Sequence, residues 1–209
     1  MYFSGPSGSG ASLGAAPRRL LTLALASSSV LAASVPRAGP RIGAVASEVD
    51  VCSRMGTHLL KRGGTAIDAM VGTVLCVGTI GMYHSGIGGG GFMLVRSPNG
   101  THEFIDFRDA APAAASEDMF KNNPSASERG GLACAVPGEL RGLEYAHKKY
   151  GRLPWRDVVA PAIKVARNGF RVSNDLIKFM NQTVDEVGDI FANDPNWAQD
   201  FAPTGRRVR

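Results

Sequence analysis

The sequence has few of the residues from which metal sites are built. Its 209 residues include three cysteines and four histidines, and neither set has the spacing of a zinc, redox or His-Glu-x-x-His motif. These residues are Cys52, Cys76, Cys134, His58, His84, His102 and His147. The sequence therefore predicts no metal site.

The sequence also lacks a nucleophile elbow and a dinucleotide-binding loop in its proper context. No Ser lies in a Gly-x-Ser-x-Gly nucleophile elbow. Gly86–Gly91 formally matches Gly-x-Gly-x-x-Gly, but a dinucleotide-binding loop follows a strand and opens a helix. Here a helical pattern precedes the glycines, an apolar strand-like run follows, and no Lys-Ser or Lys-Thr comes next. We interpret these glycines as positions where the backbone packs closely or takes a positive φ.

Acidic residues are absent from the first 47 residues, which contain four arginines. The rest of the chain is balanced, with 19 basic against 18 acidic residues. A nucleic-acid-binding domain carries a basic stripe on its folded part, and this balance argues against one. The net charge of +5 comes from the two ends of the chain, so we expect no nucleic-acid partner.

Residues 1–40 have the features of a targeting segment. Arg18-Arg19 precedes the apolar stretch Leu20–Val35, which is short for a membrane span and typical of a signal peptide. An organelle transit peptide and a short membrane anchor are the alternatives. We favour the secretory route, with an extracellular, vacuolar or membrane-anchored destination.

From residue 42 onward the pattern predicts a strand and a helical hairpin. Ile42–Ala46 has the character of a short strand, and Ser47 that of the N-cap of a helix ending at Gly63-Gly64. Thr65 and Asp68 then form a capping-box pattern before a helix that is apolar nearly all round.

Two cysteines lie at matching heights on this helical hairpin. Cys52 lies 12 residues before Gly64 and Cys76 lies 12 residues after it. A disulfide is compatible with this spacing, and so are two buried free thiols that pack as small hydrophobes.

The remainder predicts a β-hairpin followed by helices, and thus an α/β (α+β) fold. Phe92–Val95 should be a buried strand, Ser97–Gly100 a turn, and His102–Arg108 an alternating strand that turns Phe104 and Arg108 to one face and Ile105 to the other. Helices should begin at Pro137, at Pro154 and after the N-cap Ser173, and the tail from Asn193 has no periodicity.

Several blocks in one order resemble the γ-glutamyltransferase (glutathione hydrolase) family. Each block alone is modest, but the ordered set is specific, and it extends over residues 42–175. The blocks are Ile42–Ala46, Gly63–Ala69, Gly86–Leu94, Ile105–Pro112, Gly130–Leu132, Ala135–Gly142, Tyr150–Trp155 and Ala166–Phe170.

The resemblance implies a self-cleaving precursor with the four-layer αββα fold of N-terminal-nucleophile hydrolases. A new N-terminal Thr of the small subunit would attack γ-glutamyl amides, forming an acyl-enzyme that passes to water or to an acceptor amino acid or peptide. Residues 41–209 would be an incomplete helix-rich portion of the large subunit, with no catalytic residue and no need of a cofactor. Glutathione, other γ-glutamyl compounds, acceptors and the small subunit are the implied partners.

The resemblance also assigns individual residues. Arg108 would bind the α-carboxylate of the γ-glutamyl group, for which a planar guanidinium is suited; the alternative is a structural ion pair with Asp106 or Asp109. Cys52 and Cys76 resemble a disulfide pair of the animal members.

Other readings of the chain remain open. Asn99-Gly100-Thr101 and Asn181-Gln182-Thr183 are glycosylation acceptors if the chain is exported. A cephalosporin-acylase-like amidase and an inert truncated product are the alternative functions.

Overall fold

The computed structural model describes residues 43–128 and 130–208, so the proposed targeting segment 1–40 lies outside the described residues. In the described residues the first elements are helices α1 (Asp50–Lys61) and α2 (Ala66–Ile80), followed by strands β1 (Phe92–Arg96) and β2 (His102–Asp106). Short 3-10 turns at Pro124–Ser127 and Gly131–Ala133 precede α3 (Glu139–Tyr150) and α4 (Trp155–Asn168). Helices α5 (Asn174–Val187), α6 (Ile190–Asn193) and α7 (Pro195–Phe201) complete the order.

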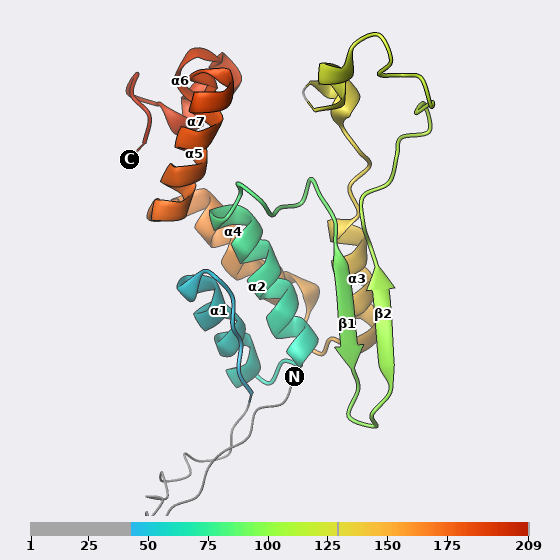
Figure 1. Cartoon of the computed structure of the whole chain (residues 1–209). Coiled ribbons are helices and arrows are strands. Elements are labelled where there is room, and N and C mark those ends of the chain that lie inside the picture. The colour runs from blue at the N-terminus through green and yellow to red at the C-terminus, as the bar shows by residue number, and fades with distance from the viewer. Residues whose placement is uncertain (1–42, 129, 209) are drawn as a thin grey trace, which may run out of the picture. The chain divides into compact units, whose positions relative to one another are not determined.

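Helix α2 lies at the centre of the main core. It is buried on most of its surface, and α1, α3 and α4 all pack against it. Figure 1 shows α4 behind α2, and α3 behind the hairpin. A second apolar cluster joins α5 to α6 around Leu176, Met180 and Phe191.

The two strands form one antiparallel sheet with Leu94 opposite Phe104. Its helix-facing side contributes Val95 and Ile105 to the core. In the described residues the sheet has only these strands, so the expected four-layer αββα fold is present only in part, as helices on one side of a small sheet.

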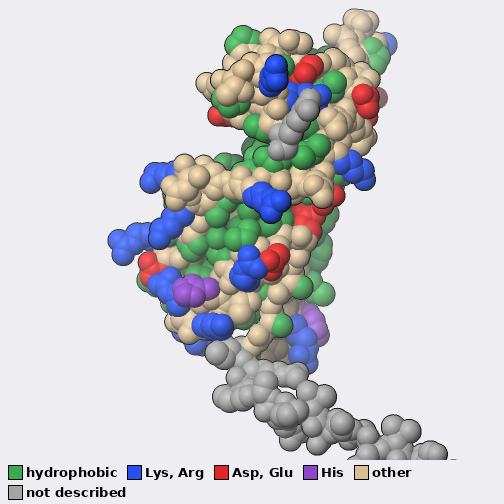
Figure 2. Space-filling view, turned by 90° about the vertical axis from the view of Figure 1, so that its left-hand side faces the viewer, with side chains coloured by type: hydrophobic (Ala, Val, Ile, Leu, Met, Phe, Trp, Pro, Cys, Tyr) green, Lys and Arg blue, Asp and Glu red, His purple; other side chains and the backbone are tan. Residues whose placement is uncertain are grey.

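Hydrophobic side chains also reach the surface of the helical side. Figure 2 shows them in the middle of the face seen from the left of Figure 1, with Lys and Arg side chains around them. Among residues 43–128 and 130–208, none of the helices is both long and apolar enough to cross a membrane.

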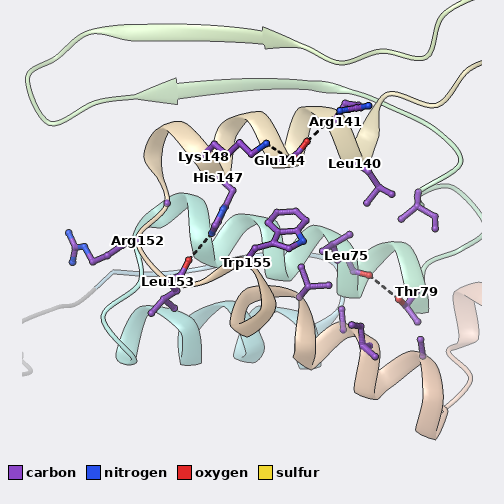
Figure 3. Close-up of a pocket in the computed structure, with 16 residues that line it drawn as sticks. Leu75, Thr79, Leu140, Arg141, Glu144, His147, Lys148, Arg152, Leu153 and Trp155 are labelled. Atoms are coloured by element: carbon purple, nitrogen blue, oxygen red, sulfur yellow. Dashed lines mark hydrogen bonds and ion pairs between the residues drawn. The ribbon is translucent and has the colours of Figure 1, made fainter.

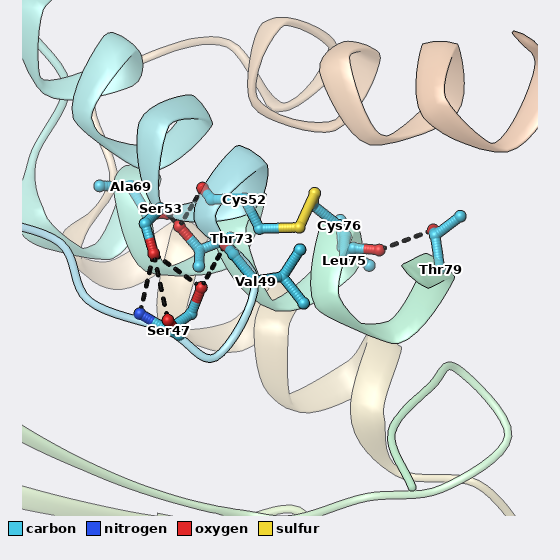
Figure 4. The surroundings of a disulfide bond; sticks show 9 residues. All are labelled: Ser47, Val49, Cys52, Ser53, Ala69, Thr73, Leu75, Cys76 and Thr79. Carbon is cyan, nitrogen blue, oxygen red and sulfur yellow. Dashed lines mark hydrogen bonds between the residues drawn. A yellow bond between two sulfur atoms is a disulfide. The ribbon is translucent and has the colours of Figure 1, made fainter. Parts of the chain in front are cut away.

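The α1–α2 hairpin contains a disulfide between Cys52 and Cys76, whose Cα atoms lie 5.5 Å apart. Figure 4 shows the bridge joining the two helices. Both cysteines are completely buried, whereas Cys134 is free and exposed. Of the two arrangements compatible with the spacing, the structure has the bridge.

Several local predictions are confirmed. Thr65 and Asp68 form the capping box of α2, and the Ser173 hydroxyl accepts from Leu176 N at the start of α5. The antiparallel hairpin is present, and its second strand alternates as expected, with Ile105 buried and Phe104 exposed.

Four local predictions are wrong. Residues 43–46 form no strand, because no described strand lies beside them. Helix α1 has Val49 as its N-cap, since the Ser47 hydroxyl bonds to Val49 O and to Ser53 Oγ instead. Helix α3 starts at Glu139, two residues after Pro137. The tail from Asn193, expected to be without periodic structure, contains the short helix α7.

Asp68 connects elements that are distant in sequence. Its carboxylate is fully buried and accepts from the backbone N–H groups of Thr65, Arg152 and Leu153 at 2.7–3.3 Å. His147 Nε2 of α3 lies 3.3 Å from the same carboxylate. The side chain thus joins the start of α2 to the α3–α4 connection.

Replacing Asp68 by Ala should lower the free energy of unfolding by about 3–5 kcal/mol, because several buried donors lose a charged acceptor together. The matched control is Asp50→Ala, which removes an exposed carboxylate from the first turn of α1 and should cost about 0.5 kcal/mol or less. Urea titrations of both variants measure the difference. A loss below about 1 kcal/mol for Asp68→Ala would show that Asp68 is not a structural hub.

Candidate functional site

The candidate substrate residue, Arg108, lies just beyond the end of β2. Its backbone N donates to Asp106 Oδ1 at 3.0 Å, and its Nε donates to Asp109 Oδ1 at 2.9 Å. The side chain is 66% exposed. Arg108 therefore forms an ion pair with Asp109, which is one of the two structural pairings considered as the alternative to substrate binding. It uses Nε, so the terminal nitrogens of the guanidinium are the groups that a second carboxylate would meet.

Glycines on both sides hold the backbone of residues 107–109. A Cβ atom at Gly90 would lie 2.3 Å from Phe107 O, and one at Gly138 would lie 2.1 Å from the same oxygen. Both distances are far inside van der Waals contact, so only glycine fits. The structure thus confirms the interpretation that the glycine run permits close backbone packing.

Backbone hydrogen bonds complete this frame. Gly138 N and Glu139 N both donate to Gly89 O, at 2.9 and 3.1 Å. Ala110 and Val136 exchange two bonds, at 2.8 and 3.1 Å, in an isolated β-bridge. Arg108 therefore extends from a segment fixed by the glycine run on one side and by the start of α3 on the other.

The open face of the hairpin lies beside this segment. Phe92, Leu94 and Phe104 are 56%, 70% and 63% exposed, and the two phenyl rings stack with centroids 5.6 Å apart. The prediction that Phe92–Val95 is buried is therefore wrong for this chain, since only Val95 is buried. An apolar sheet face of this kind is typical of an interface.

The opposite face is fastened by Glu103. Its carboxylate accepts from Lys149 Nζ and Tyr145 OH, both at 2.8 Å, and from Tyr150 OH. These hydrogen bonds, from Lys149 above all, lower the pKa of Glu103 to about 2. The same contact raises the pKa of Lys149. The cluster holds β2, and with it the Arg108 segment, against α3.

The burial of Glu139 and the long-range contacts of Asp68 were not predicted from the sequence. Glu139 is buried, its Oε1 accepts no hydrogen bond from the described residues, and burial raises its pKa. Its place on one helical face with Gly142, Leu143 and Ala146 was the available signal. The distant partners of Asp68 left no signal in the local pattern.

The two sequons lie at the surface. Asn99 Oδ1 accepts from the backbone N and the hydroxyl of Thr101 in the hairpin turn, which leaves the amide nitrogen outside these bonds. Asn181 lies on α5, and its Oδ1 accepts from Arg207. In the described part of the chain, no three His, Cys, Asp or Glu side chains gather closely enough to hold a metal ion.

Comparison with known proteins gives consistent matches. The profile of the gamma-glutamyltranspeptidase family matches residues 52–209. The chain is 55% identical over 170 residues to the glutathione hydrolase of Aspergillus flavus, covering 81% of this chain and 28% of that protein. It is 54% identical over 185 residues to the glutathione hydrolase proenzyme of Arthroderma benhamiae, covering 81% and 31%. The chain thus spans about three tenths of the length of these relatives.

Solved structures agree. The gamma-glutamyltranspeptidase of Helicobacter pylori matches with a TM-score of 0.71 and 32% identity, over 79% of this chain and 48% of that one. The cephalosporin acylase of Bacillus halodurans matches with a TM-score of 0.69 and 28% identity, over 85% and 35%.

Replacing Gly138 by Ala should lower the free energy of unfolding by about 1–3 kcal/mol, because the new methyl group would overlap Phe107 O. The control is Gly131→Ala, since a Cβ there meets nothing within 4 Å, and it should change stability by about 0.5 kcal/mol or less. Denaturant titration compares the two. Equal effects would mean that the close approach at residue 138 carries no constraint.

The Glu103 cluster predicts a specific loss of stability in acid. A depressed pKa means that the stabilisation is present above the unfolded value of about 4.3 and is lost as the pH falls towards about 2. Thermal melts between pH 5 and pH 2 should therefore show a shallower decline for Glu103→Gln than for the unchanged chain. Glu117→Gln, in an exposed loop, is the control. Parallel curves for the Glu103 variant and the unchanged chain would show that the Glu103 cluster does not contribute to stability in this pH range.

Proposed function

This chain belongs to the γ-glutamyltranspeptidase family, and we propose that it supplies the carboxylate-binding part of a γ-glutamyl site. The complete protein would hydrolyse glutathione and related γ-glutamyl compounds, or transfer their γ-glutamyl group to amino acids and peptides. The relatives in Aspergillus flavus and Arthroderma benhamiae carry the name glutathione hydrolase, which supports this substrate class.

The proposal rests mainly on the position of Arg108. Its guanidinium is exposed at the edge of an apolar sheet face, while its backbone is held by glycine contacts. A γ-glutamyl group offers an α-carboxylate, which a guanidinium binds through two parallel hydrogen bonds. Asp109 accepts a hydrogen bond from Arg108 Nε and would orient the guanidinium before the substrate binds.

The chemical step would come from the rest of the polypeptide. A Thr hydroxyl, with its own α-amine as base, would attack the γ-carbonyl, expel the amine and form an ester. Water or an acceptor amine would then break that ester and regenerate the hydroxyl. This chain would bind and orient the donor, and we propose that the exposed Phe92, Leu94 and Phe104 pack against the small subunit. By itself the chain should be inactive.

A second candidate is an amidase related to cephalosporin acylase, because the Bacillus halodurans enzyme of that name has a similar structure. Arg108 argues for γ-glutamyl donors, whose α-carboxylate needs such a partner. Comparing rates on a γ-glutamyl anilide and on a cephalosporin side-chain amide separates the two candidates. A complete protein that is inactive on both substrates would exclude both candidates.

In the complete precursor that carries this chain, Arg108→Ala should lower kcat/KM for a γ-glutamyl anilide about 30- to several-thousand-fold. The basis is a loss of about 2–5 kcal/mol when one charged partner of a desolvated pair is removed. Arg108→Lys should recover only part of the rate, because a point charge cannot hold both carboxylate oxygens. Self-cleavage should proceed, since it involves no free substrate.

Arg96→Ala is the matched control, because Arg96 also lies exposed on β1 at the far end of the sheet from Asp106. Its kinetics should be unchanged. If Arg108→Ala blocks maturation, or leaves KM for glutathione unchanged, Arg108 is a structural ion-pair residue.

We also propose export through the secretory pathway, supported by the buried disulfide and the surface sequons. Chain expressed in its own host should carry a glycosidase-sensitive mass, first at Asn99. Cys134 should be alkylated before reduction, and Cys52 and Cys76 only after it. Unglycosylated chain with all three thiols reactive would place it outside that pathway.

A further inference from the structure

A groove lies between α3 and α4, with α2 as its floor, on the side of α3 away from the sheet (Figure 3). Its volume is about 940 Å³. Its lining positions extend from Leu140 to Lys148 along α3 and from Trp155 to Ala166 along α4. At 1.5 Å per residue the α3 wall is about 12 Å long and the α4 wall about 17 Å long, which together fit a helix of about two to three turns.

The groove is apolar and open. Its large apolar side chains are Leu75, Ile87, Leu140, Trp155, Val159 and Ile163. Three of them are strongly exposed: Ile87 by 59%, Leu140 by 46% and Ile163 by 42%. Apolar side chains gathered in a concave surface, rather than scattered singly, indicate an interaction site.

The rim of the groove is basic. Arg141, Lys148 and Arg152 line it, and Glu144 is its single carboxylate. Glu144 is already paired, at 2.6 Å to Lys148 and 3.8 Å to Arg141. The remaining excess of positive charge favours a partner that carries carboxylates. Residues 1–47 contain arginines and no acidic residue, so the charge of that segment does not complement the rim.

We infer that this groove receives an amphipathic helix whose apolar face fills it and whose flanking carboxylates meet Arg141 and Lys148. The helix belongs to the polypeptide that the longer relatives carry outside the matched region, since the match spans 28% of the Aspergillus flavus protein. Helices bind grooves in this way through apolar residues spaced three and four apart. The inference rests on family membership and is independent of the proposed activity.

Trp155 provides a reporter within the groove. The chain has two tryptophans, so Trp197→Phe leaves Trp155 as the single tryptophan, which can be excited selectively over the tyrosines. The probes are overlapping 20-residue peptides that together cover the unmatched part of the Aspergillus flavus relative. We expect binding, seen as a change in Trp155 emission, to be confined to amphipathic peptides with a net negative charge.

Variants test the two parts of the interaction. Ile163→Asp and, separately, Leu140→Gln should weaken binding at least about tenfold, equivalent to about 1.4 kcal/mol. Arg141→Glu combined with Lys148→Glu should weaken the binding of acidic peptides by a similar factor. Leu132→Asp, an equally exposed apolar position outside the groove, should leave binding unchanged. Because these positions are at the surface, circular dichroism melts should confirm folding for each.

Three results would overturn the inference. The first is that no peptide binds, or that binding survives both groove substitutions. The second is dimerisation of the chain in sedimentation experiments that Ile163→Asp abolishes, which makes a second copy the occupant. The third is a change in Trp155 emission when residues 1–42 are removed, which assigns the groove to the chain's own N-terminal segment.

Discussion

Contact between backbones, with no side chain between them, is the constraint on which the candidate site depends. Phe107 O is approached so closely from Gly90 and from Gly138 that a methyl group at either position would overlap it. The two glycines belong to segments nearly fifty residues apart in sequence, and both meet the same peptide unit. This contact places Arg108 on a rigid segment rather than on a free loop.

The two faces of the hairpin have different roles. Glu103 and Ile105 face α3, where ionic, tyrosine and apolar contacts fasten the strand. Phe104 and Arg108 face away and remain exposed. The backbone pairing continues one residue beyond β2, because Phe107 and Gly91 exchange hydrogen bonds, so the contacts that hold the strand also hold the backbone beside Arg108. Asp68 has a comparable role between α2 and the α3–α4 connection, and the Cys52–Cys76 bridge does the same between α1 and α2.

Sequence patterns predicted those parts that local rules determine. The capping box at Thr65, the antiparallel hairpin and the alternation along β2 depend on neighbouring residues, and all three are present. Ser47 illustrates the limit: it has the composition of an N-cap, but Ser53 competes for its hydroxyl. Phe92 and Leu94 were expected to be buried because they are apolar, yet nothing in the described chain covers them. Arg108 stood out only through its family resemblance, since an exposed arginine paired with Asp109 has no distinctive local pattern.

The most direct test is a crystal structure of the assembled protein with glutamate bound. The account predicts that both oxygens of the α-carboxylate accept hydrogen bonds from the Arg108 guanidinium at about 2.7–2.9 Å, with Phe107 O still in contact with Gly90 and Gly138. Glutamate bound elsewhere, with Arg108 paired only to Asp109, would contradict it.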